Sequence, residues 1–310
     1  KNAESYIFLQ YYIIKDDVLF QRIREALLEK AAQGVEIRIL YDAMGCRSVG
    51  KHFWKEMEKQ GIHVAVFFPA LFGRLHLRVN YRNHRKIAVI DGKVAYVGGF
   101  NIGKEYIGLD PKFGHWRDTH LRICGSAVGG LLLRYIQDWD YAARENLFEN
   151  PKYFILPEEK AGNVKMQIIS SGPDSELQSI RDNYLRLIHK AKKSIYIQTP
   201  YFIPAESIQT ALLMATMSGV EVNLMFPCKP DHPFVYWATL SYVGELIMAG
   251  ANCYTYDNGF LHAKGLSIDG KACCYGTANM DIRSFALNFE VNAMIFDQNI
   301  AGEMERIFRE

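Results

Sequence analysis

The sequence predicts an α/β protein built from two similar halves, and three observations support this prediction. Apolar, β-rich runs alternate with helical stretches of about 10 to 15 residues, which is typical of a largely parallel sheet with helices on both faces. The order of these elements repeats in the second part of the chain. A signature of His, Lys, Asp, Gly and Asn also occurs twice with the same spacing. A duplicated α/β unit explains all three observations.

The expected strands lie at three matched positions in the two halves. The second and third strand of each half follow a Gly that ends the preceding helix, as Gly commonly does at a helix C-terminus. The matched ranges are 5–13 and 194–202, 35–40 and 220–225, and 63–68 and 252–256. The strand 5–13 is similar to the strand 194–202 when Ser5 is matched with Ser194.

The boundary between the halves is expected near residue 150. The stretch 145–164 carries Asn150-Pro151, Pro157-Glu158-Glu159-Lys160 and Gly162-Asn163, which are turn and linker residues. We therefore expect one half over 1–150 and the other over 151–310. Because both halves are needed to assemble the site, we expect them to form one compact unit.

Composition narrows the class of protein. A chain of 310 residues with 49% hydrophobic residues is globular and can bury a large core. The net charge of +2 argues against a protein that coats nucleic acid through a broad basic surface. The six Cys have no metal-site or disulfide-framework spacing, which favours reduced thiols inside a cell. The chain begins at Lys1 without Met and stops within a helical pattern, so we expect a fragment of a longer protein.

The repeated signature reads His-x-Lys-x4-Asp-x6-Gly-x-x-Asn. Its members are His84, Lys86, Asp91 and Asn101 in the first half, and His262, Lys264, Asp269 and Asn279 in the second. Residues i and i+2 of a strand point to the same face, so each half is expected to present an imidazole beside an ammonium group. The two sets of side chains are expected to meet at a pseudo-twofold centre.

These residue types match the needs of phosphodiester chemistry. Lys and Asn stabilise the negative charge of a five-coordinate phosphorus. One neutral imidazole can attack phosphorus to form a phosphohistidine, while the other, protonated, donates to the departing alkoxide and later acts as a base. Asp91 and Asp269 each precede Gly in a tight-hairpin pattern, which favours a structural role for both over proton transfer.

Carboxylate partners for the imidazoles are expected at Asp118 and Glu290. Each follows its signature by a few tens of residues in a strand-like segment. A carboxylate that fixes the imidazole tautomer is a common supporting device. An ordinary ion pair is the alternative for each. The sequence shows no metal-ligand spacing, so we expect neither a metal ion nor another cofactor.

Longer motifs around the signature carry a family resemblance. They are Asn80-Tyr81-Arg82-Asn83-His84-Arg85-Lys86, Tyr96–Gly103, Trp116–His120, Pro200–Pro204, Lys229–His232, Gly259–Lys264 and Ala278–Phe285. The chain resembles the phospholipase D superfamily and, more narrowly, its bacterial cardiolipin synthases. The resemblance implies two tandem α/β/α sandwich halves related by a pseudo-twofold axis, with the active site between them.

The resemblance also implies an activity. One phosphatidylglycerol would transfer its phosphatidyl group to a His and release glycerol, and a second would attack to give cardiolipin. We expect His84 to be the nucleophile and His262 the general acid and base, although the near-symmetric repeats leave that order open. The resemblance also implies amino-terminal membrane-spanning segments, which this sequence does not contain. We therefore expect such segments in the full-length protein, where they would anchor it in the cell membrane with the catalytic part on the cytoplasmic side.

A lipid substrate needs a route from the bilayer. The segment 67–78 is apolar with interspersed basic residues and could insert into the membrane interface, and 234–240 is a second, aromatic-rich candidate. Core packing is an equal alternative for 67–78 and the favoured interpretation for 234–240. The residues expected to contact the substrate are Arg82, Asn83, Tyr201 and Phe72.

Three alternatives remain open at this stage. A phospholipase D would pass its phosphatidyl group to water, and a nuclease or phosphodiesterase of the same superfamily would act on other diesters. A lipid-binding module with a vestigial site would not react at all. The modest charge argues against nucleic acid as a partner. The acceptor alcohol and the oligomeric state are left undetermined.

Overall fold

The computed structural model describes residues 2–69, 80–155 and 162–310. The chain separates into two compact units. The first comprises Lys1–Leu109 and His120–Asn163, and the second comprises Asp110–Thr119 and Val164–Glu310. The sequence did not predict that residues 110–119 belong to the second unit. The division into 1–150 and 151–310 stays a prediction about domain organisation.

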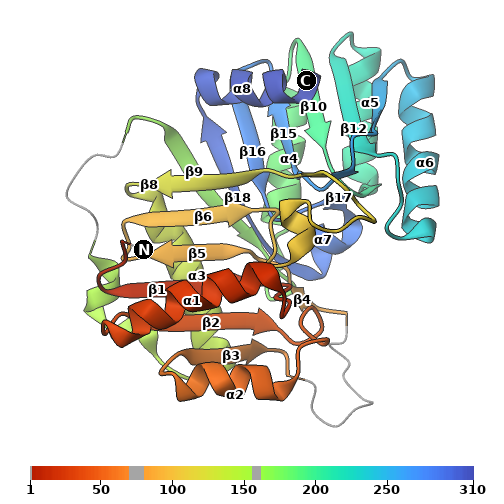
Figure 1. Ribbon diagram of the computed structural model, residues 1–310. Helices are drawn as coiled ribbons and strands as arrows, with labels where there is room; N and C mark the ends of the chain where they lie inside the picture. The colour runs from red at the N-terminus through yellow and green to blue at the C-terminus, as the bar shows by residue number, and fades with distance from the viewer. Residues whose placement is uncertain (1, 70–79, 156–161) are drawn as a thin grey trace. The chain divides into compact units, whose positions relative to one another are not determined.

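The first unit is a sheet between two layers of helices (Figure 1). The strands of this sheet are β1 (Tyr6–Tyr11), β2 (Glu36–Asp42), β3 (His63–Phe67), β5 (Ile87–Ile90), β6 (Val94–Gly98) and β8 (His120–Cys124), and the short strand β4 (Arg82–Asn83) of the unit is not part of it. Its helices are α1 (Val18–Ala32), α2 (Lys51–Lys59) and α3 (Ala127–Ala143), with short 3-10 turns η1 (Lys104–Ile107), η2 (Leu147–Glu149) and η3 (Pro151–Phe154).

The second unit repeats this plan. Its strands are β7 (Trp116–Arg117), β9 (Lys165–Ser171), β10 (Ser194–Gln198), β11 (Phe202–Ile203), β12 (Glu221–Pro227), β13 (Asn252–Tyr256), β14 (Phe260–Leu261), β15 (Gly265–Ile268), β16 (Ala272–Gly276), β17 (Met280–Asp281) and β18 (Asn288–Phe296). Its helices are α4 (Ser179–Lys190), α5 (Glu206–Met217), α6 (Pro233–Met248), α7 (Ile282–Ala286) and α8 (Gln298–Arg309).

The strand orders of the two sheets correspond one to one. The first is β3-β2-β1-β5-β6-β8 and the second is β13-β12-β10-β15-β16-β18, to which β9 adds an antiparallel neighbour of β18. β1, β2 and β3 are parallel, whereas β5, β6 and β8 run antiparallel to their neighbours. The expectation of a largely parallel sheet is therefore wrong for half of each sheet. The hairpin at Asp91-Gly92 reverses the chain without a crossover helix, which forces antiparallel pairing.

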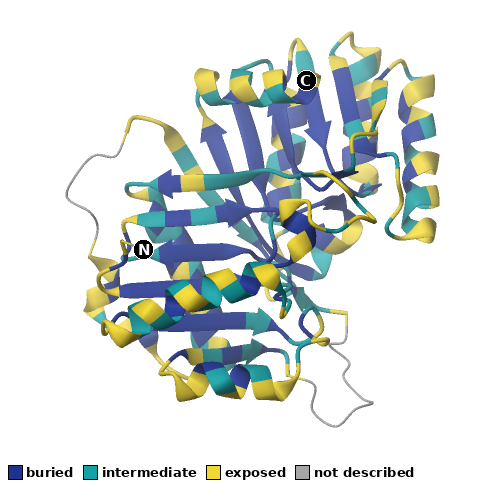
Figure 2. Ribbon diagram, in the orientation of Figure 1, coloured by how far each residue is buried: buried dark blue, intermediate teal, exposed yellow. Residues whose placement is uncertain are grey.

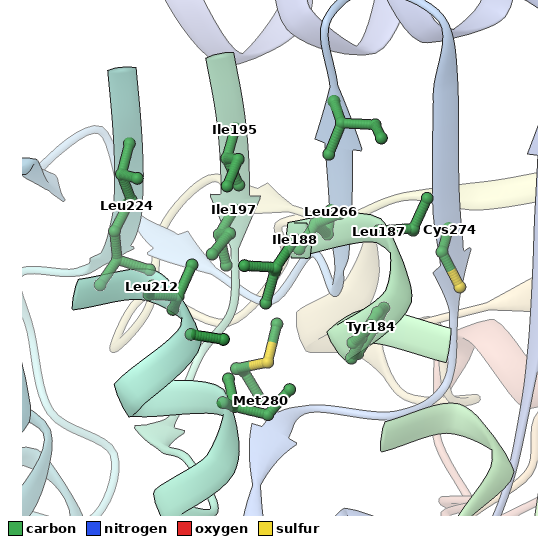
Figure 3. Packing of buried hydrophobic residues seen from close by; sticks show 14 of the residues in the cluster. Tyr184, Leu187, Ile188, Ile195, Ile197, Leu212, Leu224, Leu266, Cys274 and Met280 are labelled. Atoms are coloured by element: carbon green, nitrogen blue, oxygen red, sulfur yellow. The ribbon is translucent and has the colours of Figure 1, made fainter. Parts of the chain in front are cut away.

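Successive side chains of a strand point to opposite faces of the sheet, so each central strand packs against the helices on both faces. In the first unit, Ile7 and Leu9 join the core under α1 and α2, while Phe8 between them stacks on Tyr135 of α3, with ring centroids 4.9 Å apart. The second unit does the same, because Ile195 and Ile197 enter the core with α4, α5 and α6. Figure 3 shows this core, and Figure 2 shows the buried strands between more exposed helices. Tyr196, on the opposite face, meets Phe308 of α8 at 5.1 Å.

The register of the sheets corrects the match between the repeats by one residue. Gln10 pairs with Ile87, and Gln198 pairs with Gly265. Ile87 and Gly265 each stand three residues after their signature His. Gln10 therefore corresponds to Gln198, so Tyr6, and not Ser5, is the counterpart of Ser194.

The first part of the expected junction packs on the first unit. Glu145 accepts a hydrogen bond from Arg38 at 2.6 Å, and both Lys152 (2.7 Å) and the Tyr153 hydroxyl (2.8 Å) bond to Glu36. These contacts fasten residues 145–153 to β2. Residues 156–161, which include all of Pro157-Glu158-Glu159-Lys160, lie outside the described residues.

Candidate active site

The two His-Lys pairs lie just before a strand and not within one. His84 to Lys86 occupies the step from β4 to β5, and His262 to Lys264 the step from β14 to β15. The expectation that these side chains sit on a strand is wrong by a few residues. The ladder with the neighbouring strand begins at Ile87 and at Gly265, so the His-Lys segments extend beyond it.

The geometry around each Lys is the same in both units. Lys86 Nζ donates to the carbonyl oxygen of His84 at 2.5 Å, and Lys264 Nζ donates to the carbonyl oxygen of His262 at 2.5 Å. Both Lys are almost completely buried. Each ammonium group is therefore held against the backbone of its own signature His.

In the second unit, Asp118 holds the His262 ring. The distance from Asp118 Oδ2 to His262 Nδ1 is 2.6 Å, although the two residues are 144 positions apart in sequence. The carboxylate that follows the first signature thus serves the imidazole of the second. Lys264 Nζ lies 2.9 Å from the same nitrogen, but the Asp118 contact is shorter and a carboxylate can only accept, so we assign a proton to Nδ1, directed at Asp118. Nε2 of His262 is then the nitrogen available for chemistry.

A close backbone approach brings Asp118 to this position. β7 pairs in parallel with β14, and the His262 N–H donates to the Arg117 carbonyl at 2.7 Å. Gly259 makes the approach possible, because a Cβ atom there would lie 1.9 Å from the His115 carbonyl oxygen. Gly259 also has a φ of +114°, which favours Gly over other residues. The Thr119 N–H donates to the other oxygen of Asp118 at 2.7 Å.

The electrostatics of this cluster follow from burial and charge. Burial raises the pKa of Asp118, but Lys264 and His262 more than offset it and leave that pKa below its usual value. Burial lowers the pKa of Lys264 to about 8, and the carboxylates of Asp118, Glu290, Asp281 and Asp231 only partly oppose it. Asp118 is therefore ionised at neutral pH, whereas Lys264 titrates not far above it.

Glu290 is completely buried in β18. Its carboxylate accepts from the Thr277 hydroxyl at 2.6 Å and from the Asn288 side-chain amide at 3.1 Å. It also acts electrostatically on Lys264. Its predicted role as an imidazole partner stays a prediction.

The two signature Asn have different surroundings. Asn101 Oδ1 accepts from the Ile13 N–H at 3.0 Å, and its amide nitrogen donates to the Tyr106 hydroxyl at 2.7 Å. Asn279 donates to Asp281, whereas its buried Oδ1 has no hydrogen-bond partner among the described residues. Neither Asn caps a helix, because the N-cap of α7 is Asp281 and that of η1 is Gly103.

Asp91 and Asp269 fasten the start of the neighbouring strand. Asp91 accepts from the backbone N–H groups of residues 4, 5 and 6 at 2.8 to 2.9 Å. Asp269 accepts from those of residues 192, 193 and 194 at 2.8 to 3.2 Å. Both have a positive φ, as does the following Gly, which matches the tight hairpin that the sequence predicts. These contacts are structural.

The residues predicted to contact substrate have different surroundings in the structure. Asn83 is buried and its side chain bonds to Gln10 and Asp138, which favours an internal role. Arg82 is partly exposed and donates to the Tyr81 carbonyl at 2.6 Å. Tyr201 donates to Asp231, a residue that also acts electrostatically on Lys264. Phe72 and most of the segment 67–78 lie outside the described residues.

The second lipid-contact candidate is exposed. On α6, Phe234 is 81%, Trp237 64% and Met248 90% exposed. Core packing is therefore the wrong reading for Phe234 and Trp237. Within the described residues, no helix has both the length and the apolar character needed to cross a membrane. In the same part of the chain, no group of three or more His, Cys, Asp and Glu side chains is arranged to hold a metal ion.

Sequence reasoning missed two features of the site. Tyr12 places its ring 4.9 Å from that of His84 and 5.5 Å from Lys86 Nζ, and Trp116 places its ring 5.1 Å from that of His262. Each residue stands in a motif that the sequence singled out for other reasons. The signal that the sequence offered was an aromatic residue at the end of a strand for Tyr12, and in a short paired strand for Trp116.

Comparison with protein-family models decides the family. A model described as "Cardiolipin synthase, PLD-like domain" matches residues 1–110 and 184–310. The chain belongs to this family. It is 53% identical to the major cardiolipin synthase of Bacillus subtilis (strain 168) over 309 residues, covering 99% of the chain and 64% of that protein. It is 52% identical to a cardiolipin synthase of Staphylococcus aureus (strain N315) over 310 residues, covering 99% and 62%.

The solved structures support the same fold. The phosphatidylserine synthase of Haemophilus influenzae Rd KW20 matches with a TM-score of 0.74 at 16% identity, covering 99% of this chain and 81% of that one. At that identity the likeness shows the fold alone, a phospholipase D-like α/β arrangement. The chain spans somewhat under two thirds of the length of the curated relatives it matches.

Proposed function

We propose that the chain transfers a phosphatidyl group from one phosphatidylglycerol to another, giving cardiolipin and glycerol. The observation that carries this proposal is the repeated His-Lys geometry, with His262 held by an ionised carboxylate, in a member of the cardiolipin synthase family. The relatives' names supply the reaction, and the residues supply a means to perform it.

In the first step, an imidazole nitrogen of His84 attacks the phosphorus of phosphatidylglycerol. A nitrogen–phosphorus bond forms, the bond to the glycerol oxygen breaks, and His262 gives its Nε2 proton to the departing alkoxide. Free glycerol leaves, and the phosphatidyl group remains on His84. An ionised Asp118 stabilises the imidazolium form of His262 that this step requires, which favours His262 as the acid.

In the second step, the terminal hydroxyl of another phosphatidylglycerol attacks the phosphohistidine. His262 Nε2 accepts the hydroxyl proton, the nitrogen–phosphorus bond breaks, and cardiolipin forms. Lys86, Lys264, Asn101 and Asn279 stabilise the charge on phosphorus in both steps. His262 ends each cycle protonated, ready for the next donor.

The lipid substrate also requires contact with a bilayer, and we propose α6 for this role. Phe234, Trp237, Leu240, Ile247 and Met248 are all exposed on it. Its only charged residue is Glu245, which bonds to Gln209 of α5. An aromatic, nearly uncharged helix face suits the membrane interface, where Trp and Phe are favoured. The protein would then work at the membrane surface.

The reaction is tested with phosphatidylglycerol vesicles in the presence of EDTA, with the lipid products separated. Cardiolipin and free glycerol, lost in both His84→Ala and His262→Ala, are expected. His52→Ala is the control, because that side chain is 84% exposed. Phosphatidic acid in place of cardiolipin would identify a hydrolase, and loss of turnover in EDTA would contradict a metal-independent mechanism.

Membrane contact is tested by sedimentation with the same vesicles. Phe234→Ser/Trp237→Ser should lower the bound fraction several-fold. Phe148→Ser removes another exposed Phe, 57% exposed and outside α6, and should not. Equal binding by the two variants would exclude α6 as the contact.

A further inference from the structure

A buried ionic network lies next to His84 in the first unit, and nothing in the proposed reaction uses it. Arg85 donates to both oxygens of Asp138 in α3 at 2.6 Å. Gln10 bonds to Asp138 at 2.5 Å and to Asn83 at 2.9 Å, and Asn83 bonds to Asp138 at 3.0 Å. Arg85 and Asp138 are 1% and 5% exposed.

This network holds the backbone on both sides of His84. The Asn83 N–H donates to Asp42 at 2.9 Å, and the Arg85 N–H donates to the Asn83 side chain at 3.3 Å. The side chains of residues 83 and 85 both reach Asp138. His84 is therefore the residue between two anchored neighbours.

The second repeat shows that the fold itself does not require this network. Leu261 and Ala263 flank His262 at the corresponding positions, and both are completely buried. An apolar pair thus completes the same α/β plan. A buried ion pair is costly to desolvate and is often no more stable than an apolar replacement. Its presence in one repeat alone points to a purpose other than stability.

We infer that the Arg85–Asp138 pair, with Gln10 and Asn83, positions His84 for attack on phosphorus. The inference rests on the proposed function for the role of His84. Attack requires the nitrogen to lie close to phosphorus and in line with the leaving oxygen, and a displacement of about 1 Å can cost about 100-fold in rate. Anchoring both neighbours restricts the backbone from which the imidazole projects. Arg85 and Asp138 are positioning residues, since neither is exposed to a substrate.

The test replaces the pair by apolar residues of similar size, in Arg85→Met/Asp138→Leu. Removing one partner alone would leave a buried charge unpaired and could unfold the protein. The double change removes both charges together but takes an acceptor from the side-chain amides of Gln10 and Asn83, so we expect a folded variant with a lowered melting temperature. The control is Arg38→Met/Glu145→Leu, which removes another, more exposed ion pair between β2 and the segment that follows α3 without touching the His84 segment.

Two readouts separate positioning from a structural role. The first is hydrolysis of bis(p-nitrophenyl) phosphate, with the phosphohistidine trapped after a short reaction. The Arg85→Met/Asp138→Leu variant should lose about 10- to 100-fold in kcat at nearly unchanged KM, and trap correspondingly less phosphohistidine per folded molecule. Arg85→Lys, which keeps the charge, should recover part of the rate. The control variant should neither lose kcat nor trap less phosphohistidine.

The second readout is amide hydrogen exchange of a peptide covering residues 80–90. Faster exchange in the Arg85→Met/Asp138→Leu variant, and not in the control, is expected because the anchoring of this segment is lost. It needs no substrate, so it tests the anchoring even if phosphatidylglycerol proves to be the wrong lipid. Unchanged exchange, or unchanged kcat in a folded variant, would overturn the inference.

Discussion

The two repeats share one strand order and one His-Lys geometry, yet they hold their His in different ways. In the second unit a carboxylate bonds to the ring of His262 directly. In the first unit a buried ionic network anchors the backbone on both sides of His84. Duplication preserved the elements that place Lys beside His, while the surroundings diverged. Such divergence is what two imidazoles need if one is to attack phosphorus and the other is to carry a proton.

Substitution of Asp118, the carboxylate that bonds to His262, should have the largest effect on activity. Asp118→Asn keeps the size of the side chain but removes the negative charge that stabilises the protonated ring of His262. We expect kcat for cardiolipin formation to fall by about 10²- to 10⁴-fold, the usual range for general acid–base catalysis. Steady-state kinetics with phosphatidylglycerol measure this.

Asp257→Asn is the control for Asp118→Asn, because Asp257 is an exposed carboxylate of the same unit. It should leave kcat within about twofold. A kcat for Asp118→Asn close to that of the wild type would contradict the proposed role of His262 as the acid and base.

The alkaline side of the pH profile should report Lys264. Its pKa is lowered to about 8 by burial, so the free enzyme loses this positive charge as the pH rises through that value. We expect kcat/KM to fall above about pH 8, approaching tenfold per pH unit. Measurement between pH 6 and pH 10 checks it. Lys264→Met should have low activity throughout and lack this limb, and a flat wild-type profile to pH 10 would contradict the prediction.

The same shift has a defined sign for stability. The unfolded chain keeps the Lys264 proton up to its ordinary pKa of 10.5, while the folded chain releases it near 8. The unfolded state therefore binds more protons between these values, and this group makes the folded state more stable as the pH rises across them. Through Lys264, stability and activity should thus move in opposite directions over this interval.

The signature was the part of the site that sequence could predict best. Spacing of two residues placed Lys86 beside His84, and Asp-Gly gave the hairpin at Asp91, because both depend on local backbone geometry. The Asp118–His262 contact depends on a strand pairing across 144 residues, which no local pattern encodes. Arg85–Asp138 was missed for a similar reason, since a charged residue in a helix ordinarily indicates a solvent-exposed face.

The fold was predictable to the same extent. The alternation of apolar runs and helices gave the elements and their duplication, but not the direction of the strands after the hairpin. Matching the repeats by sequence put them out of register by one residue, because Ser5 and Ser194 are alike while the ladder pairs Gln10 and Gln198 with equivalent positions. Register is set by cross-strand pairing and by which face is buried, and neither is visible in a single strand.

Substitution of the two signature Asn should lower the stability of the protein by different amounts, a smaller effect than the changes in activity above. Asn101→Ala removes the acceptor of the partly buried Ile13 N–H and the buried donor to Tyr106, so we expect a loss of about 1–3 kcal/mol. Asn279→Ala removes an oxygen that has no partner within the part of the chain that the structure describes, so its loss should be smaller. Urea denaturation of both variants measures the difference. A larger loss for Asn279→Ala would show that its oxygen is not the unsatisfied group it is in the structure.

The hairpin Asp residues should show the smallest effect and the closest similarity between repeats. Backbone N–H donors lower the pKa of Asp269 although partial burial raises it, so its contribution to stability is present above the ordinary pKa of 3.8 and is lost as the pH falls below it. Asp269→Asn should cost about 1 kcal/mol at pH 7 and less at about pH 3, below the ordinary pKa, where the contribution of the wild-type carboxylate is being lost. Asp91→Asn removes the same kind of turn contact and should lose a similar amount at pH 7. Urea denaturation at both pH values checks this, and the activity of each folded variant should stay within about threefold of the wild type. A much larger loss of activity in either would mean that the carboxylate takes part in the reaction and that the repeats differ at this turn as well.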